Sequence, residues 1–99
     1  MATQIEFEVN EDTSLKYPQK YKVYLLNDDY TSMEFVIDIL ITIFHKSYEE
    51  AEKTMLEVHK NERALCGIYI HEIAETKVMQ VSRLAKENGF PLKATMEEE

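Results

Sequence analysis

Alternating apolar and polar positions begin at about residue 20 and predict a β-strand over residues 20–26. In this stretch Tyr21, Val23 and Leu25 share one face, and the residues between them share the other. Residues 1–19 have a weaker pattern with four acidic side chains, so we expect a flexible N-terminal extension there. Residues 20–99 would then form one core domain.

Two helices are predicted next, each beginning at a hydroxyl residue that is followed three positions later by glutamate. Thr31 with Glu34, and Ser47 with Glu50, match the capping box, in which each side chain accepts a hydrogen bond from a free backbone N–H. The first helix would run to about residue 46, and the second would pack against it as a hairpin. Their apolar positions recur every three or four residues: Met33, Val36, Ile37, Leu40, Ile41 and Phe44, then Ala51, Met55 and Val58.

The last third of the chain predicts a strand, a helix and a strand. Residues 64–70 are apolar and rich in β-formers, which indicates a buried strand, and Gly67 within it suggests a bulge or a close neighbour. A helix should follow from about Glu72 and stop near Gly89, before a short strand containing Leu92, Ala94 and Met96. The order β-α-α-β-α-β predicts an α+β fold, a small single-domain sandwich whose three-stranded antiparallel sheet packs on helices.

The charge balance narrows the classes of partner. With 19 acidic and 11 basic residues the formal net charge is −8, which disfavours binding to nucleic acid or to anionic membranes. The single cysteine, Cys66, cannot form an intrachain disulfide, and the first ten residues do not resemble a signal peptide. No apolar run is long enough to span a membrane. We therefore expect a cytoplasmic protein and, since no heptads occur, a monomer.

The polar seam, Asn27, Asp28 and Asp29, lies between the first strand and the first helix. Turn chemistry and charge at a helix start could explain it, and His59 on the second helix could be a structural residue. If the hairpin brings His59 to the seam, however, Asn27, Asp28 and a neutral imidazole offer the acceptors that a primary ammonium needs. Apolar side chains would stand beside them: Met33, Val36, Met55 and Val58. An amine next to a hydrophobic side chain describes the first residue of a peptide.

Other chemistries remain open for the same residues. The two aspartates and His59 could hold a cation in a metal-dependent hydrolase, although no HExxH motif or calcium-loop spacing occurs. Cys66 could act as a nucleophile with His59 as its base, although a cysteine in mid-strand is usually inert core. The chain could also be an acidic docking module that has no preference for a free amine.

Three stretches resemble the ClpS adaptor family, and the resemblance covers about residues 21–99. They are NDDYTSMEFV at residues 27–36, the helix face with Met55, Val58 and His59, and IAETKV at residues 73–78. Members of this family are not enzymes and use no cofactor. They bind N-degrons, proteins whose first residue is a bulky hydrophobe (Leu, Phe, Tyr or Trp), and deliver them to the ATP-dependent Clp AAA+ unfoldase and its peptidase for degradation.

The resemblance also implies roles for individual residues. The α-amine would be bound by Asn27, Asp28 and His59, and the peptide backbone would lie near Asp29 and Thr31. The hydrophobic pocket would be lined by Met33, Val36, Met55, Val58 and Leu92, with Met33 as a gate against β-branched residues. The N-terminal domain of the unfoldase would bind Glu72 and Lys77, and residues 1–19 would match the extension that the unfoldase engages.

One departure from the family pattern lies at Ser32, where the family often has proline. If Thr31 is the helix cap, Ser32 is the first helical residue, a position where proline contributes stiffness rather than chemistry. We therefore expect the serine to have little functional effect.

Overall fold

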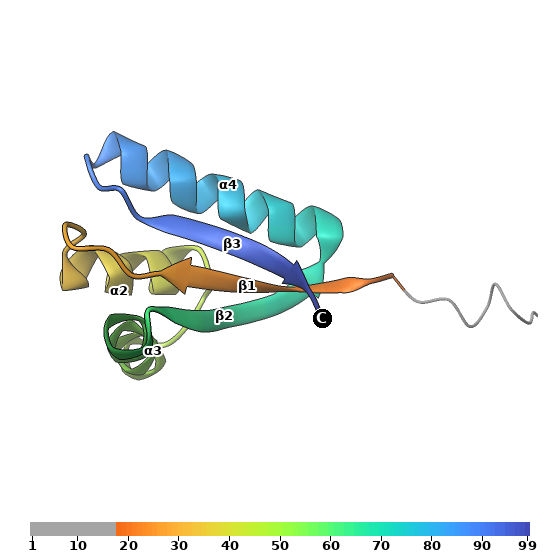
Figure 1. Ribbon diagram of the computed structural model, residues 1–99, viewed down its shortest axis with the longest axis horizontal. Coiled ribbons are helices and arrows are strands. Elements are labelled where there is room, and N and C mark those ends of the chain that lie inside the picture. Colours follow the sequence, from red (N-terminus) through yellow and green to blue (C-terminus); the bar gives the residue numbers. More distant parts are fainter. Residues whose placement is uncertain (1–17) are drawn as a thin grey trace, which may run out of the picture.

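The computed structural model describes residues 18–99 and contains three strands and three helices in the predicted order (Figure 1). Most of the predicted N-terminal extension thus lies outside the described residues. The elements are β1 (Lys20–Leu26), α2 (Met33–Thr42), α3 (Tyr48–Asn61), β2 (Arg63–Ile70), α4 (His71–Glu87) and β3 (Lys93–Glu98). The sheet has the order β2-β1-β3, and β1 is antiparallel to both neighbours. The predicted fold class is confirmed.

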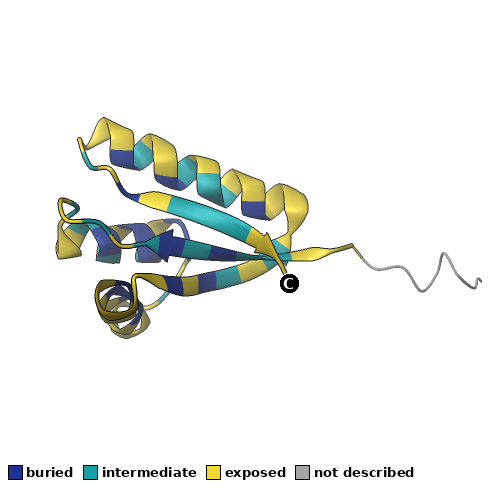
Figure 2. Cartoon of the chain, in the orientation of Figure 1, coloured by how far each residue is buried: buried dark blue, intermediate teal, exposed yellow. Residues whose placement is uncertain are grey.

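The core forms where one face of the sheet meets the helices (Figure 2). On the central strand, Val23 and Leu25 are fully buried, as the alternation predicted, and Leu25 lies opposite Ala64 on β2 and Ala94 on β3. α4 packs along β3, while α3 packs against both α2 and β2. None of the helices between residues 18 and 99 is long and apolar enough to cross a membrane.

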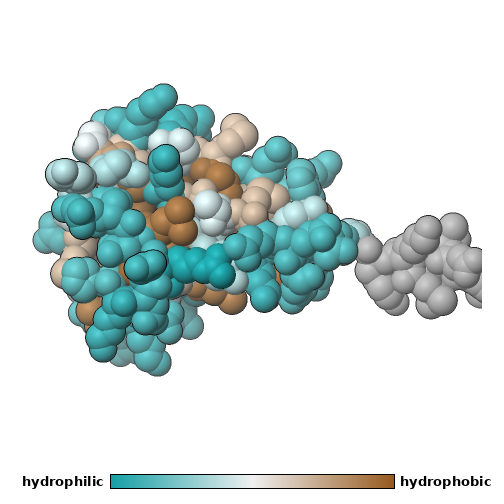
Figure 3. Space-filling view, viewed as in Figure 1, coloured by the Kyte–Doolittle hydropathy of each residue, from teal (hydrophilic) through white to brown (hydrophobic). Residues whose placement is uncertain are grey.

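The strand β2 is only half-buried, which corrects the prediction of a buried strand. Ala64 and Cys66 are buried, but Leu65, Ile68 and Ile70 are 40%, 42% and 38% exposed. The reason is that an antiparallel sheet can leave one face in water, and an apolar run alone does not reveal this. The face of the molecule drawn in the space-filling view shows hydrophobic residues among hydrophilic ones (Figure 3).

The bulge predicted at Gly67 is present. Val23 pairs with Gly67 but its neighbour Tyr24 pairs with Leu65, so β2 contains one extra residue at this point. A Cβ at Gly67 would collide with the side chain of Tyr69, which is the close neighbour that the sequence suggested.

The helix α2 begins one residue later than predicted, because its N-cap is Ser32 and not Thr31. The Ser32 hydroxyl accepts a hydrogen bond from the Phe35 N–H at 3.1 Å. Thr31 instead donates its hydroxyl to Asp28 at 2.8 Å. A charge-assisted bond of this kind is stronger than a neutral one, so the nearby carboxylate captures the first hydroxyl and leaves the second to cap the helix.

The other helix ends follow the sequence more closely, with one exception. α2 stops at Thr42 rather than near residue 46, because the chain turns through a left-handed residue, His45, with φ of 58°. The capping box of α3 at Ser47 and Glu50 is confirmed. α4 begins at His71 and is followed by Gly89 with φ of 77°, which confirms the predicted stop.

Candidate functional site

The seam and the α2–α3 hairpin enclose a cavity of about 220 Å³, which we call the seam cavity. It is lined by nine residues: Asn27, Asp28, Asp29, Thr31, Met33, Val36, Met55, Val58 and His59. All nine are candidate residues from the sequence. The hairpin thus brings His59 to the same cavity as the seam, which was the geometric condition on which the ammonium hypothesis depended.

The Asp28 carboxylate is fixed by hydrogen bonds within the seam. Its Oδ1 accepts from the backbone N–H of Tyr30 at 2.8 Å and of Thr31 at 2.7 Å, and its Oδ2 accepts from the Thr31 hydroxyl at 2.8 Å. Partial burial acts to raise the pKa of Asp28, but these bonds from Thr31 and Tyr30 outweigh it and leave the pKa below its ordinary value. At neutral pH the cavity therefore contains a fixed negative charge.

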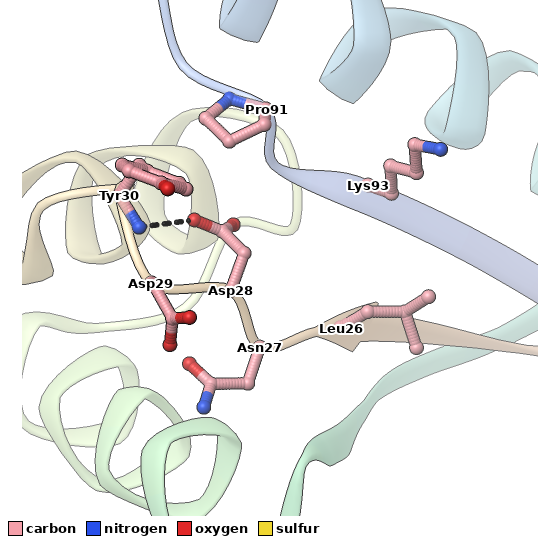
Figure 4. Close-up of a pocket in the computed structure, with 7 residues that line it drawn as sticks. All are labelled: Leu26, Asn27, Asp28, Asp29, Tyr30, Pro91 and Lys93. Atoms are coloured by element: carbon pink, nitrogen blue, oxygen red, sulfur yellow. Dashed lines mark hydrogen bonds between the residues drawn. The ribbon is translucent and has the colours of Figure 1, made fainter.

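The position of the seam relative to α3 is set by the backbone of Asn27. Its N–H donates to the carbonyl of Glu62 at 2.7 Å, and Glu62 is the left-handed residue that ends α3, with φ of 71°. His59 lies in the last turn of the same helix. Its exposed side chain is therefore held near the seam by a backbone bond that is independent of any side chain in the cavity. Figure 4 shows the side chains of Asn27 and Asp29 directed toward α3.

The apolar wall comes from both helices. Val36 of α2 and Met55 and Val58 of α3 are buried, with exposed fractions of 6%, 7% and 3%. Met33, the first residue of α2, is 49% exposed and stands at the rim. The cavity therefore combines a polar end at the seam with an apolar end between the helices.

Three candidate residues lie elsewhere. Leu92 is not among the residues that line the seam cavity; it is 3% exposed in the core, directly before β3. Glu72 is exposed in the first turn of α4. Lys77 is half-buried, and its ammonium donates to the carbonyl of Ile43 at 2.6 Å, just past the end of α2.

A second hollow, of about 360 Å³, adjoins the seam on the side of β3, and we call it the outer hollow (Figure 4). It shares the seam residues and adds Leu26, Tyr30, Pro91 and Lys93. The sequence analysis missed Pro91 and Lys93, because they approach the seam only through the pairing of Leu26 on β1 with Lys93 on β3. An explicit register for the predicted antiparallel strands could have found Pro91 and Lys93. It also missed Tyr30, although Tyr30 directly follows the seam in the sequence.

The rival chemistries find little support among the described residues. Within residues 18–99, no group of three or more His, Cys, Asp or Glu side chains is placed to hold a metal ion. Cys66 lies in the core and does not line the seam cavity. Burial raises the pKa of its thiol to about 12, which leaves the thiol protonated at neutral pH.

Comparison with known proteins gives one family. Residues 16–95 match the family described as ATP-dependent Clp protease adaptor protein ClpS. The ATP-dependent Clp protease adapter protein ClpS of Wolinella succinogenes is 50% identical over 93 residues, 94% of this chain and 91% of the relative. That of Desulforapulum autotrophicum is 59% identical over 83 residues, 84% of this chain and 80% of the relative. The structure of Agrobacterium tumefaciens ClpS2 bound to L-phenylalaninamide has a TM-score of 0.81 and 42% identity, and the match covers 84% of this chain and 100% of that one.

Proposed function

Since this chain belongs to the ClpS family, and is thus a non-catalytic adaptor of the Clp protease, we propose that its seam cavity binds the first residue of N-degron substrates. The ligand would be the first residue of a substrate, with a free α-amine and the bulky hydrophobic side chain of Leu, Phe, Tyr or Trp. The observation that supports this most directly is that nine candidate residues from the sequence line one cavity with a polar and an apolar end.

The polar end suits an ammonium group. An ammonium has three N–H donors, and each oxygen of a carboxylate can accept about two hydrogen bonds. Oδ1 of Asp28 already accepts two bonds and Oδ2 accepts one, so Oδ2 keeps room for a ligand. The amide oxygen of Asn27 and a ring nitrogen of neutral His59 would be the other two acceptors. Asp29 and Thr31 would lie beside the peptide backbone as it leaves the cavity.

The apolar end suits one large side chain. Val36, Met55 and Val58 form a buried wall, and the half-exposed Met33 at the rim can adapt its flexible side chain to the ligand. A β-branched first residue would be hindered at Met33. L-Phenylalaninamide, the ligand in the related ClpS2 structure, has both a free α-amine and an aromatic side chain, which supports the same division of roles here.

Simple energetics explain why both ends are needed. Burial of a Leu-sized or Phe-sized side chain is worth about 1.5–3 kcal/mol, and each hydrogen bond of the ammonium about 1.5–3 kcal/mol. Association subtracts at least about 4 kcal/mol. The apolar end alone does not overcome that term, and three ammonium bonds alone would leave roughly 0.5–5 kcal/mol, short of the about 8 kcal/mol of a micromolar affinity. An internal leucine, which has no free amine, would therefore bind very weakly.

Delivery would require a second surface, for the N-terminal domain of the Clp AAA+ unfoldase. Glu72 is exposed and available for such a contact, whereas Lys77 already donates to Ile43 and would present only part of its side chain. We also propose that residues 1–19 serve as the extension that the unfoldase engages, and that the adaptor acts as a cytoplasmic monomer.

The direct test is isothermal titration with the peptide Leu-Ala-Ala-Ala-Lys and its N-acetylated form. The free peptide should bind with an affinity near micromolar, and acetylation should weaken binding by roughly thirtyfold or more. His59→Ala should also weaken the free peptide, whereas the matched control His71→Ala should not, because His71 packs against Tyr21 away from the cavity. Equal binding of the two peptides would instead favour a docking module without amine recognition.

A further inference from the structure

The outer hollow begins where the seam cavity ends. Both are lined by Asn27, Asp28 and Asp29, so the two hollows are separated only by the seam. A substrate held by its amine in the seam cavity must leave past these residues. The chain that follows the first residue therefore has a ready path to the outer hollow.

The spacing selects one residue of the substrate. Neighbouring extended chains lie about 4.8 Å apart, and two residues of an extended peptide advance about 6.6 Å. Side chains of an extended peptide alternate, so the third residue points to the same side as the first and lies just over one chain width beyond it. With the first side chain in the seam cavity, the third would cross the seam and face the outer hollow.

The lining of the outer hollow favours an uncharged aromatic ring. Figure 4 shows Tyr30 and Pro91 at one end of the hollow and Leu26 and Lys93 at the other, with Asp28 between them. Tyr30 is 79% exposed, so its ring is open to a partner. A ring that lies between these groups would contact an aromatic face, a proline ring and an ammonium, all of which pack well on aromatic side chains.

The charges around the hollow oppose an acidic third residue. Asp28 and Asp29 would repel it, whereas Lys93 would offset part of their attraction for a basic one. The only ion pair among residues 18–99 joins Arg63 to Glu97, so the Lys93 ammonium is not engaged in one. Another hollow next to the seam is bordered by Asn61, Glu62 and Arg63, but the Arg63 guanidinium is already held by Glu97 at 2.6 Å and lies over the Tyr24 ring.

We propose that the outer hollow is a second specificity site, which binds an aromatic side chain at the third position of the substrate. This inference rests on the proposed function, because the amine in the seam cavity sets the register of the peptide. It extends recognition from the first residue to a pattern: a bulky hydrophobic residue first and an aromatic residue third.

The test uses three peptides with free amines: Leu-Ala-Ala-Ala-Lys, Leu-Phe-Ala-Ala-Lys and Leu-Ala-Phe-Ala-Lys. The second and third have the same composition and differ only in the position of phenylalanine. Isothermal titration should show roughly three- to tenfold tighter binding when phenylalanine is third than when it is second. Tyr30→Ala and Lys93→Met should each reduce this ratio toward one.

The matched control is Tyr48→Ala, since Tyr48 is also a largely exposed tyrosine, 61% exposed, but lines neither hollow. It should leave the ratio unchanged. Equal affinities of the two isomeric peptides, a preference for phenylalanine second, or a ratio that survives both variants would overturn the inference while leaving amine recognition intact. Failure of all three peptides to bind would instead overturn the proposed function, and this inference with it.

Discussion

The two helices that wall the seam cavity begin in different ways. α3 has a closed capping box, in which the Ser47 hydroxyl accepts from the Glu50 N–H at 3.2 Å and the Glu50 carboxylate accepts from the Ser47 N–H at 3.1 Å. α2 has the single cap bond from the Phe35 N–H to Ser32. α2 follows Thr31 and Ser32, with Glu34 nearby, and α3 follows Ser47, with Glu50 nearby. The two sequences are thus similar, and the difference lies in the residues that surround them.

The surrounding group that matters is Asp28. It takes both the backbone N–H and the hydroxyl of Thr31, so the polar residue nearest to α2 serves the seam and not the helix. At α3 no such competitor stands before Ser47, and both polar side chains serve the helix. The comparison indicates that α2 has a simpler cap in exchange for a fixed carboxylate in the seam cavity.

The largest expected effect comes from removal of that carboxylate's charge. Asp28→Asn should weaken binding of Leu-Ala-Ala-Ala-Lys by roughly tenfold to a hundredfold, because the ammonium loses a charge-assisted partner. The matched control at the other helix start, Glu50→Gln, should leave the affinity unchanged, since Glu50 bonds only to its own helix cap. Isothermal titration measures both. Equal losses in the two variants would mean that total charge, and not the seam, attracts the peptide.

The same carboxylate should make stability depend on pH in a defined window. The pKa of Asp28 in the folded state lies below its ordinary value of 3.8, so the ionised form is favoured by folding. The stabilisation is fully present above that value and is lost as the pH falls through the lower pKa of the folded state.

Urea unfolding of the native chain and of Asp28→Asn measures this contribution. The difference in free energy of unfolding between them should be constant from pH 7 to about pH 5 and should shrink below about pH 4. A difference that grows on acidification would contradict the assigned bonds from Thr31 and Tyr30.

A smaller effect is expected from the Thr31 hydroxyl. Thr31→Val removes one donor to Asp28 but not the backbone bond, so it should lower the free energy of unfolding by about 1 kcal/mol. Because Ser32 caps α2, hydrogen exchange at the Phe35 N–H should stay slow in this variant and become faster in Ser32→Ala. If Thr31→Val releases the Phe35 N–H as strongly as Ser32→Ala does, Thr31 contributes to the cap after all.

These helix starts also show what the sequence could and could not predict. Element order and the buried faces follow from periodicity, which depends on neighbouring residues alone, and the approach of His59 to the seam follows from the short connection within the hairpin. The cap of α2 was placed one residue early because the pattern at Thr31 and Glu34 does not include Asp28 as a competitor. The capping-box pattern considers only the spacing of residues, whereas in the folded chain the Thr31 hydroxyl bonds to the stronger acceptor, the Asp28 carboxylate.

Other misses have a longer-range cause. Whether the side chains of Leu65, Ile68 and Ile70 are exposed depends on which face of the sheet the helices cover. The composition of the strand itself does not determine that. The approach of Pro91 and Lys93 to the seam depends on the register between β1 and β3. Contacts between strands far apart in sequence decide both features, so local patterns could not predict them.

The smallest effect, and the sharpest comparison of the two helix starts, comes from proline at each cap. Ser32 and Ser47 have φ of −71° and −68°, both close to the value that proline requires. The Ser47 N–H donates to Glu50, but among residues 18–99 the Ser32 N–H has no hydrogen-bond acceptor. Ser32→Pro and Ser47→Pro each lose a hydroxyl cap, which lowers stability, and each stiffen the unfolded chain, which raises it. These two effects offset each other to within about 1 kcal/mol.

Only Ser47→Pro also loses a backbone bond, so it should be less stable than Ser32→Pro by about 1 kcal/mol in urea unfolding. This result would explain how a proline fits at residue 32, where the ClpS family often has one, without a role for proline chemistry. Equal losses from the two prolines would mean that the reciprocal bond of the α3 capping box adds nothing to stability, and that the two helix starts differ only in their geometry.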